Sequence, residues 1–253
     1  MTSAIYYENV LYGADVVSQD TIAGFPWING VDGRTSTQAG FDTGSQVVVI
    51  DLGASWGGQS VNFIGFAKHN IASSGANVEI ETDSDAGFGS PVSVYDSAPV
   101  SDNVSVETIS AVSIERYVRI TVSGQTSPCY ISDVSLGEKL AFPSGQPMGY
   151  MPPKFAYNDM VINSTSQGAD LVGSIRIPKA KSCRIELKFA DEVWVNANWP
   201  SFIDHLPRPF YYLWDEQNHP NDAAYVWIKK KYPQVKFGPG DYQQATIDGE
   251  GIT

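Results

Sequence analysis

Four phrases between residues 23 and 137 decide the expected fold of this chain: AGFPWINGVDGRT (Ala23–Thr35), VVVIDLG (Val47–Gly53), RYVRITV (Arg116–Val122) and ISDVSLG (Ile131–Gly137). The second is a continuous apolar run closed by a glycine, which is typical of a strand buried on both faces. The last two are also short and strand-like, and turn-forming residues separate them from their neighbours. The phrases predict that short strands build the first half of the chain.

The sequence around these phrases has the same character. In the run Val78–Thr82, Val78 and Ile80 alternate with Glu79 and Glu81, which places one face on a core and the other in water. Many short strands with few helical periods indicate an antiparallel sandwich. Further strands are predicted at Val61–Ala67, Val104–Ile109, Tyr117–Val122 and Tyr130–Leu136.

Taken together, the four phrases resemble the discoidin (coagulation-factor type C) β-sandwich. The resemblance implies an antiparallel jelly roll over residues 1–140, in a module that binds sugars, lipid headgroups or proteins rather than performing chemistry. The family commonly has an Asn-x-x-Asp-Gly segment, which here is Asn29–Gly33. It commonly has a tryptophan after the threonine that follows, where this chain has Gln38 and Phe41. The resemblance therefore does not extend to ligand specificity.

The Asn29–Gly33 segment is predicted to structure its own loop. The side chains of Asn29 and Asp32 can bond nearby backbone donors, and Gly33 can adopt a positive φ. A sugar ligand needs exposed aromatic rings, because ring faces stack on the apolar face of a pyranose. The candidate ligand-binding residues in turn-rich stretches are Trp27, Trp56 and Phe88, together with Arg34. The alternative for each ring is a plug that closes the end of the sandwich.

Charge divides the chain into two units. Of 253 residues with net charge −12, residues 1–140 hold 16 acidic and 5 basic side chains (net −11), and residues 141–253 hold 12 and 11 (net −1). This asymmetry favours two domains. Because binding to nucleic acid requires clustered basic residues, the first half is not expected to bind it. Cys129 and Cys183 fall one in each half and are interpreted as buried thiols of a protein assembled in a reducing compartment.

No feature of the sequence predicts catalysis or a cofactor. His69, His205 and His219 lack zinc-site spacing, and there is no nucleophile elbow or phosphate loop. The acidic run Glu79–Asp85 offers oxygen ligands for Ca²⁺, but a solvated hairpin is the favoured interpretation. We expect no catalytic residues, no metal and no cofactor. The first residues lack a secretory signal, and no run of about 18 apolar residues predicts membrane insertion.

A linker at residues 141–153 separates the two predicted domains, because the segment Phe142–Pro153 has four prolines and two glycines. Residues 154–253 are predicted to form a smaller β-rich assembly domain with one or two short helices. Asp191–His205 reads as a helix, and Phe210–Trp214 reads as an aromatic strand. Asn221–Lys230 fits either a helix or a strand, and the chain is expected to end in a strand followed by a loose tail.

The second half is dense in aromatic residues, which concentrate at permanent interfaces. The predicted oligomer-interface residues are Trp199, Phe210, Tyr212, Trp214 and Trp227, with an aromatic core as the alternative. The stretch Ile203–Asp215, followed by Pro220-Asn-Asp and a terminal strand, resembles tail-tip proteins of bacteriophages. That resemblance implies a ring-forming domain of the kind found in distal tail and baseplate proteins.

The first hypothesis is therefore a structural virion protein of a phage tail tip, assembled in the cytoplasm of the host bacterium. Its expected partners are other copies in a ring, with six as the expected number, and the neighbouring tail-tube and tail-hub proteins. The sandwich could also touch a host surface glycan. The alternatives are a lectin or tail-fibre adhesion module, and an all-β glycan-cleaving enzyme. No partner nucleic acid and no membrane insertion are expected.

Overall fold

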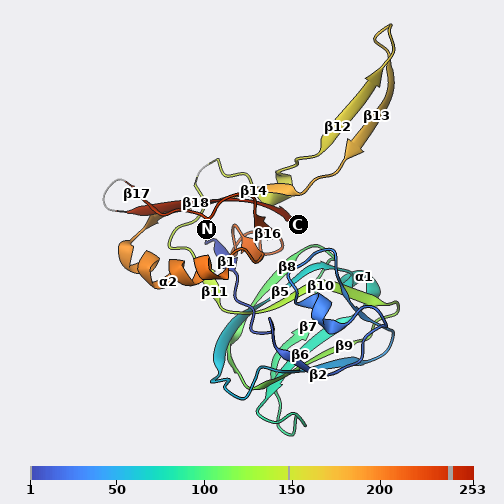
Figure 1. The fold of residues 1–253 in the computed structure, drawn as a ribbon, viewed down its shortest axis with the longest axis vertical. Helices are drawn as coiled ribbons and strands as arrows, with labels where there is room; N and C mark the ends of the chain where they lie inside the picture. The colour runs from blue at the N-terminus through green and yellow to red at the C-terminus, as the bar shows by residue number, and fades with distance from the viewer. Residues whose placement is uncertain (1, 148, 239–241) are drawn as a thin grey trace.

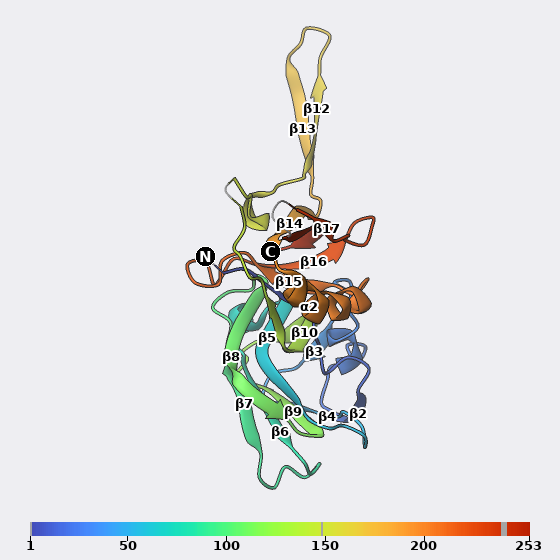
Figure 2. The ribbon, with the colours of Figure 1, turned by 90° about the vertical axis from the view of Figure 1, so that its left-hand side faces the viewer.

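The computed structural model describes residues 2–147, 149–238 and 242–253. These residues form three parts, all built mainly of antiparallel strands (Figure 1). A sandwich of two sheets lies at one end, a second domain built on a larger sheet lies beside it, and a two-stranded hairpin projects from the second domain (Figure 2). The mainly β fold predicted from the sequence is confirmed.

The sandwich consists of a five-stranded sheet packed on a four-stranded sheet. The order of the first sheet is β2 (Asp15–Gln19), β4 (Gln46–Asp51), β9 (Tyr117–Ser123), β6 (Asn77–Asp83) and β7 (Val92–Ser97). The order of the second is β3 (Ala39–Phe41), β10 (Cys129–Gly137), β5 (Gln59–His69) and β8 (Ser105–Ile114). Two short helical segments, η1 (Trp27–Gly30) and α1 (Ile71–Ser74), lie in the connections.

Alternation in the sequence explains the core of the sandwich. In β6, Val78 and Ile80 are buried while Glu79 and Glu81 are partly exposed, as predicted. The apolar run at residues 47–52 becomes β4, which is flanked by a strand on each side and buries Val48 and Ile50. Both cysteines are free and buried, which confirms their interpretation as thiols.

The second domain is a sheet with the order β11, β1, β15, β16, β18 and β14, and β17 pairs with β18. One element corrects the predicted domain boundaries. The N-terminal strand β1 pairs with β11 and β15 of this sheet rather than with the sandwich. The sandwich is thus an insertion between β1 and β11. The bounds are β1 (Ala4–Tyr6), β11 (Lys139–Ala141), β14 (Lys181–Ala190), β15 (Phe210–Leu213), β16 (Ala223–Ile228), β17 (Lys236–Phe237) and β18 (Gln243–Ile252).

Helix α2 (Glu192–His205) lies where the sequence predicts a helix, and covers one face of this sheet. It begins at Asp191, whose carboxylate accepts a hydrogen bond from the Trp194 amide at 2.7 Å, as an N-cap does.

The stretch 221–230, for which the sequence fits either a helix or a strand, forms the strand β16. The predicted loose tail is wrong, because β18 continues to Ile252. No helix in the described residues is long and apolar enough to cross a membrane.

The described residues of the predicted linker are irregular from residue 142 to 152, while Ala141 ends β11 and Pro153 begins the short helix η2 (Pro153–Phe155). The irregular part packs along the edge of β14. The Gln146 side chain accepts a hydrogen bond from the Glu186 amide (3.1 Å) and donates one to the Glu186 carbonyl (3.2 Å). The Ser144 hydroxyl donates to the Lys188 carbonyl at 2.6 Å. The linker therefore covers an edge that would otherwise be open to another strand.

The projecting hairpin, called the arm from here on, follows the short helix η2 (Pro153–Phe155). Its strands are β12 (Met160–Thr165) and β13 (Leu171–Ile177), and every residue of both is exposed. Figures 1 and 2 both show the arm pointing away from the sandwich and from the sheet of the second domain.

Candidate functional sites in the interdomain contact and the arm

The sheet of the second domain is apolar on both faces where β1, β15 and β16 lie. Along β15, Phe210 and Tyr212 face the core under α2, while Tyr211 and Leu213 face the sandwich. This alternation follows from the two-residue period of a strand. The face toward the sandwich forms one buried cluster with β5 and β8 that contains Ala4, Tyr6, Phe63, Ala67, Val104, Val106, Tyr211, Leu213, Ala223 and Tyr225.

A buried carboxylate lies at the centre of this interdomain contact. Asp133 of β10 is 3% exposed, and it accepts hydrogen bonds from the hydroxyls of Tyr211 (2.7 Å), Tyr225 (3.0 Å) and Ser135 (2.8 Å). Burial raises the pKa of Asp133 to about 6, although these hydrogen bonds oppose the rise. Gly65 gives the Tyr211 ring room, because a Cβ there would lie 2.9 Å from it. The two domains are therefore joined by hydrogen bonds to Asp133 that lie within a mainly apolar interface.

The predicted loop-structuring residues make local hydrogen bonds. Asp32 accepts from the Arg34 amide at 2.8 Å and from the Thr37 hydroxyl at 2.7 Å. The Asn29 side chain donates to the Gln38 carbonyl at 3.2 Å, and Gly33 has a φ of +73°. These contacts fix the loop within the sandwich.

This loop faces the second domain. A Cβ at Gly33 would lie 3.4 Å from the Pro209 ring, and the Arg208 guanidinium lies 3.8 Å from the centroid of the Tyr12 ring. Between them is a cavity of about 60 Å³ that reaches Asp133. It has room for about two water molecules. A small-molecule pocket is several times larger, so no sugar fits there.

Two of the predicted ligand-binding aromatic residues are buried. Trp27 is 1% exposed in the core of the sandwich, and Phe88 is 8% exposed, with the Arg119 guanidinium 4.4 Å from its ring centroid. Neither ring has a face to offer a sugar, which corrects both predictions. Trp56 is half-buried in an exposed loop, where its indole N–H donates to the Ile114 carbonyl at 2.7 Å. Arg34 is exposed.

In the acidic run, the carboxylates of Glu81 and Asp83 are paired with donors of the same chain. Glu81 forms an ion pair with Arg119 at 2.6 Å. The carboxylate of Asp83 accepts from the amides of Ser90 (2.9 Å) and Asp85 (3.0 Å), and these bonds lower its pKa. Among the described residues, His, Cys, Asp and Glu side chains form no group of three that could hold a metal ion.

The predicted oligomer-interface residues lie mostly in the interior of one copy. Trp199, Phe210 and Tyr212 are buried in the cluster between α2 and the sheet, so they are not available to another copy. Trp214 and Trp227 are half-buried. For the three buried residues the alternative, an aromatic core, is correct, because a small domain needs large side chains to fill its interior.

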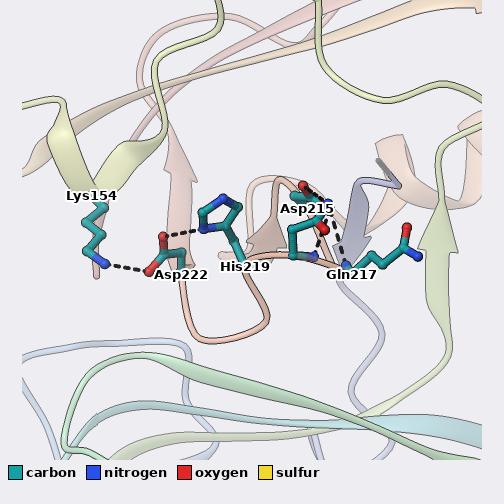
Figure 3. A network of polar contacts seen from close by, with 6 residues as sticks. Lys154, Asp215, Gln217, His219 and Asp222 are labelled. Carbon is teal, nitrogen blue, oxygen red and sulfur yellow. Dashed lines mark hydrogen bonds and ion pairs between the residues drawn. The ribbon is translucent and has the colours of Figure 1, made fainter.

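The phrase around Trp214 and Asp215 structures a loop (Figure 3). Trp214 stacks on His219 with ring centroids 4.5 Å apart, and Asp215 accepts from the amides of the second and third residues after it at 3.2 and 3.3 Å. The Asp222 carboxylate forms an ion pair with the Lys154 ammonium at 2.8 Å, and it lies 3.5 Å from a ring nitrogen of His219. Because Lys154 belongs to η2, this network holds the base of the arm.

A groove of about 830 Å³ lies on the second domain beside the lysine run 229–231. Six basic side chains line it, Arg184, Lys188, Lys229, Lys230, Lys231 and Lys236, against two acidic ones, Glu186 and Asp248. Lys229 pairs with Glu250 at 2.5 Å, and Glu186 pairs with Arg184 (3.1 Å) and Lys188 (2.7 Å). The lining therefore keeps a positive net charge after these pairs are formed.

The arm is amphipathic. Its register pairs Met160 with Ile177 and Ile162 with Ile175, so these four aliphatic side chains share one face. They are 40% to 65% exposed. The opposite face carries the polar residues Asn163, Ser174 and Arg176 together with Val161, which is 59% exposed, and Val172 at the register shift is 70% exposed. The sequence around Gly173–Pro178 is strand-like, and the strand β12 was not predicted, although Met160 and Ile162 alternate with smaller or polar residues.

No protein-family model matches the sequence, and a search of curated proteins gives no match. Solved structures similar to about half of the chain include carbohydrate-binding modules. The CBM32 module of AlyQ, in complex with 4,5-unsaturated mannuronic acid, is 23% identical (TM-score 0.39) and covers 52% of this chain and 96% of its own. A chitosan-binding module from Paenibacillus sp. IK-5 is 20% identical (TM-score 0.40) over 51% and 98%. A module of a Clostridium perfringens family 31 glycoside hydrolase is 15% identical (TM-score 0.40) over 52% and 98%.

Proposed function

We propose that this chain is a self-assembling structural subunit, and specifically a ring component of a bacteriophage tail tip. In this proposal the second domain builds the ring, and the sandwich is an attachment module carried on it. The arm is the observation that carries the proposal. A lone two-stranded hairpin is marginally stable in water, so an arm with an apolar face needs a partner surface.

The size of the uncovered face supports this argument. With about 200 Å² for each fully exposed large apolar residue, the four aliphatic residues of the arm leave roughly 400 Å² of apolar surface in water. A contiguous apolar patch of that size on a soluble protein commonly marks an interaction site. The network around Asp222 holds the base of the arm, which limits the positions the arm can take.

The interdomain contact gives the sandwich a fixed orientation on the second domain. In a ring, every sandwich would therefore present the same surface in the same direction. The resemblance of residues 203–215 to tail-tip proteins is what connects such an assembly with a phage tail. The tail-tube and tail-hub proteins would then be its neighbours.

Native mass spectrometry of the purified chain tests the proposal. The expected spectrum contains a closed oligomer whose mass is a multiple of 27.5 kDa, with six copies as the predicted number. A variant in which residues 161–176 are replaced by a short Gly-Ser turn should be monomeric and folded. Its matched control, Gln167→Ala at the tip of the hairpin, should assemble as the wild type does. A monomeric wild-type protein at high micromolar concentration would refute the proposal.

Carbohydrate binding by the sandwich is a second candidate function, and Trp56 is the observation that favours it. The indole N–H bond to the Ile114 carbonyl fixes this ring in an exposed loop, and a fixed ring is what stacking on a pyranose needs. A glycan array should then give signals that Trp56→Ala abolishes. Phe25→Ala, an exposed aromatic residue elsewhere on the sandwich, should retain them. Equal binding by both variants would exclude Trp56 as the sugar-binding residue.

A further inference from the structure

One face of the sheet of the second domain is covered by the sandwich along only part of its width. Tyr225 of β16 lies under the sandwich on this face, and Ile252 at the end of β18 packs against the same cluster. Because side chains alternate along a strand, Gln244, Thr246 and Asp248 of β18 lie on the same face as Ile252. All three are half-buried or exposed. Figure 2 shows β14, the neighbour of β18, on the side of the second domain farther from the sandwich.

The strand register shows that the side chains of this open part form one continuous surface. Arg184 of β14 is opposite Asp248 of β18, and Lys236 of β17 is opposite Gln244. Glu186 follows two residues after Arg184 and therefore lies on the same face. Opposite residues of an antiparallel pair have Cβ atoms about 5 Å apart. This surface, together with the loop at residues 229–234, is the lining of the groove of about 830 Å³.

The charge of this groove is opposite in sign to that of the chain. Six of the 16 basic side chains line it, although the net charge of the chain is −12. When Glu250 is included as the partner of Lys229, three acidic groups oppose these six. Among the described residues, Lys230, Lys231 and Lys236 take part in no ion pair. Because a cleft lined by an excess of one charge attracts ligands of the opposite charge, the groove favours an anion.

The groove continues across β14 into a second hollow of about 350 Å³. Arg184, Glu186 and Lys188 line both hollows, and Tyr150 of the linker lines the second one. The stretch of β14 from Ser182 to Lys188 runs along this surface and spans about 20 Å. An extended chain therefore fits these two hollows better than a compact small molecule does.

The uncharged and acidic members of the lining indicate the kind of chain. Asp248 is exposed, and its carboxylate can accept hydrogen bonds from hydroxyl groups. Tyr232 is 50% exposed, which leaves ring surface that can stack on a pyranose. Further hydroxyl and amide groups in the lining belong to Ser182, Gln234, Gln244 and Thr246. These groups suit a ligand that carries hydroxyl groups between its negative charges.

We propose that this groove binds an acidic polysaccharide, a chain of sugars of which some carry carboxylates. The carboxylates pair with Lys230, Lys231 and Lys236, sugar hydroxyls donate to Asp248, and one sugar ring stacks on Tyr232. The site lies on the second domain, so this inference goes beyond the proposed function. It depends neither on self-assembly nor on sugar binding by the sandwich.

Two other polyanions fit the lining less well. A nucleic acid carries a phosphate about every 3.4 Å along each strand, so it would place phosphates against Glu186 and Asp248. The centre of a protein–protein interface is depleted in Lys, Glu and Asp, whereas these residues make up much of this groove. An extended peptide commonly adds to an open sheet edge, and here the linker covers the edge of β14.

Isothermal titration calorimetry on the full chain tests the site, with oligomers of galacturonic acid and fragments of hyaluronan as the acidic probes. The wild type should bind at least one of them, and raising the salt concentration should weaken that binding because it screens exposed charges. Uncharged maltose oligomers should show no binding that depends on Lys230 and Lys231. Absence of binding to both acidic probes would overturn the inference.

A pair of charge-matched variants locates the binding. Lys230→Gln/Lys231→Gln removes two charges from the groove and should weaken the binding of the acidic probe about tenfold. Lys68→Gln/Lys179→Gln removes the same charge from exposed positions elsewhere and is the matched control. This control should bind as the wild type does. Equal weakening by both variants would show an effect of total charge rather than a site, and would contradict the inference.

Asp248→Ala distinguishes recognition of a sugar from attraction of any polyanion. The variant removes a negative charge, so a groove that acts only through its charge would bind every anion more tightly. If Asp248 accepts hydrogen bonds from sugar hydroxyls, the acidic probe should bind about fivefold more weakly. Circular dichroism confirms that each variant is folded.

Three results would overturn the inference while leaving the proposed function intact. The first is tighter binding of the acidic probe by Asp248→Ala. The second and third are wild-type binding of a thymidine oligonucleotide, or of polyglutamate, that is tighter than its binding of both acidic probes. These results would point to a nucleic acid or to an acidic protein segment as the occupant. None of them changes the oligomer mass that tests self-assembly.

Discussion

The sheet of the second domain and the arm each carry an apolar surface. One is covered within the chain and the other is exposed. The face that carries Tyr6, Tyr211 and Tyr225 is covered by the sandwich of the same chain. The hydroxyls of Tyr211 and Tyr225 donate to Asp133, and that of Tyr6 donates to Glu216 at 2.6 Å. The face of the arm that carries Ile162 and Ile175 is left 46% and 65% exposed at these two residues by the part of the chain that the structure describes. The first surface lies on strands that are buried on both faces, whereas the second lies on a hairpin whose strands are exposed on both faces. The first contact stabilises the monomer, and the exposure of the second face is the basis of our proposal that another copy covers it.

Removing Tyr211 should give the largest effect on the stability of the monomer. Tyr211→Ala leaves a cavity between the domains and removes one hydrogen bond from a buried carboxylate, so it should lower the free energy of unfolding by about 4 kcal/mol. Ile175→Ala in the arm should change it by less than about 0.5 kcal/mol at monomeric concentrations. Urea denaturation measures both. Tyr211→Phe keeps the ring and isolates the hydrogen bond. Equal losses for Tyr211→Ala and Ile175→Ala would contradict the distinction between the two faces.

The buried carboxylate should make the interdomain contact sensitive to pH. The pKa of Asp133 is raised from 3.8 to about 6, so the folded state holds a proton that the unfolded state has released. The contribution of Asp133 to the free energy of unfolding is therefore fully present below about pH 4. It is lost as the pH rises through 6, and the total loss is about 3 kcal/mol. Asp133→Asn should remove this loss. The difference in unfolding free energy between wild type and variant, measured from pH 4 to pH 7, checks it, and a pH-independent difference would refute it.

Alanine substitution at two glycines, one in each region, gives a matched comparison with a smaller expected effect on stability. Gly65→Ala places a Cβ 2.9 Å from the Tyr211 ring and should cost about 1–3 kcal/mol. Gly173→Ala lies in the arm, where a Cβ meets nothing within 4 Å, and should change stability by no more than about 0.5 kcal/mol. Differential scanning calorimetry compares the melting temperatures of the two variants. A lower melting temperature for Gly173→Ala than for Gly65→Ala would contradict the packing described here.

Much of the fold could be predicted from the sequence, because local patterns specify it. The alternation of Val78 and Ile80 with glutamates marks β6, and the acidic residue Asp191 marks the start of α2. The placement of β1 could not be predicted, because a three-residue strand has no period and its partners lie more than 130 residues away. Non-local pairing of this kind leaves no local signal.

The candidate sites were less predictable than the fold. Trp27 and Phe88 lie in turn-rich stretches, where the same sequence fits an exposed ring or a plug for the core. Asp133 lies in a strand-like phrase that gives no sign of the tyrosines opposite it. The aliphatic face of the arm becomes recognisable only when the register of β12 and β13 is known, because neither strand alone carries more than a few apolar residues.

Hydrogen–deuterium exchange at two protein concentrations tests the central claim most directly. The amides of β10 and β15 should be protected at both concentrations, because their contact lies within one chain. The amides of residues 160–177 should exchange rapidly in dilute solution and become protected when the protein is concentrated. Exchange in the arm that is equally fast at both concentrations, with the oligomer present, would contradict the claim that another copy covers it.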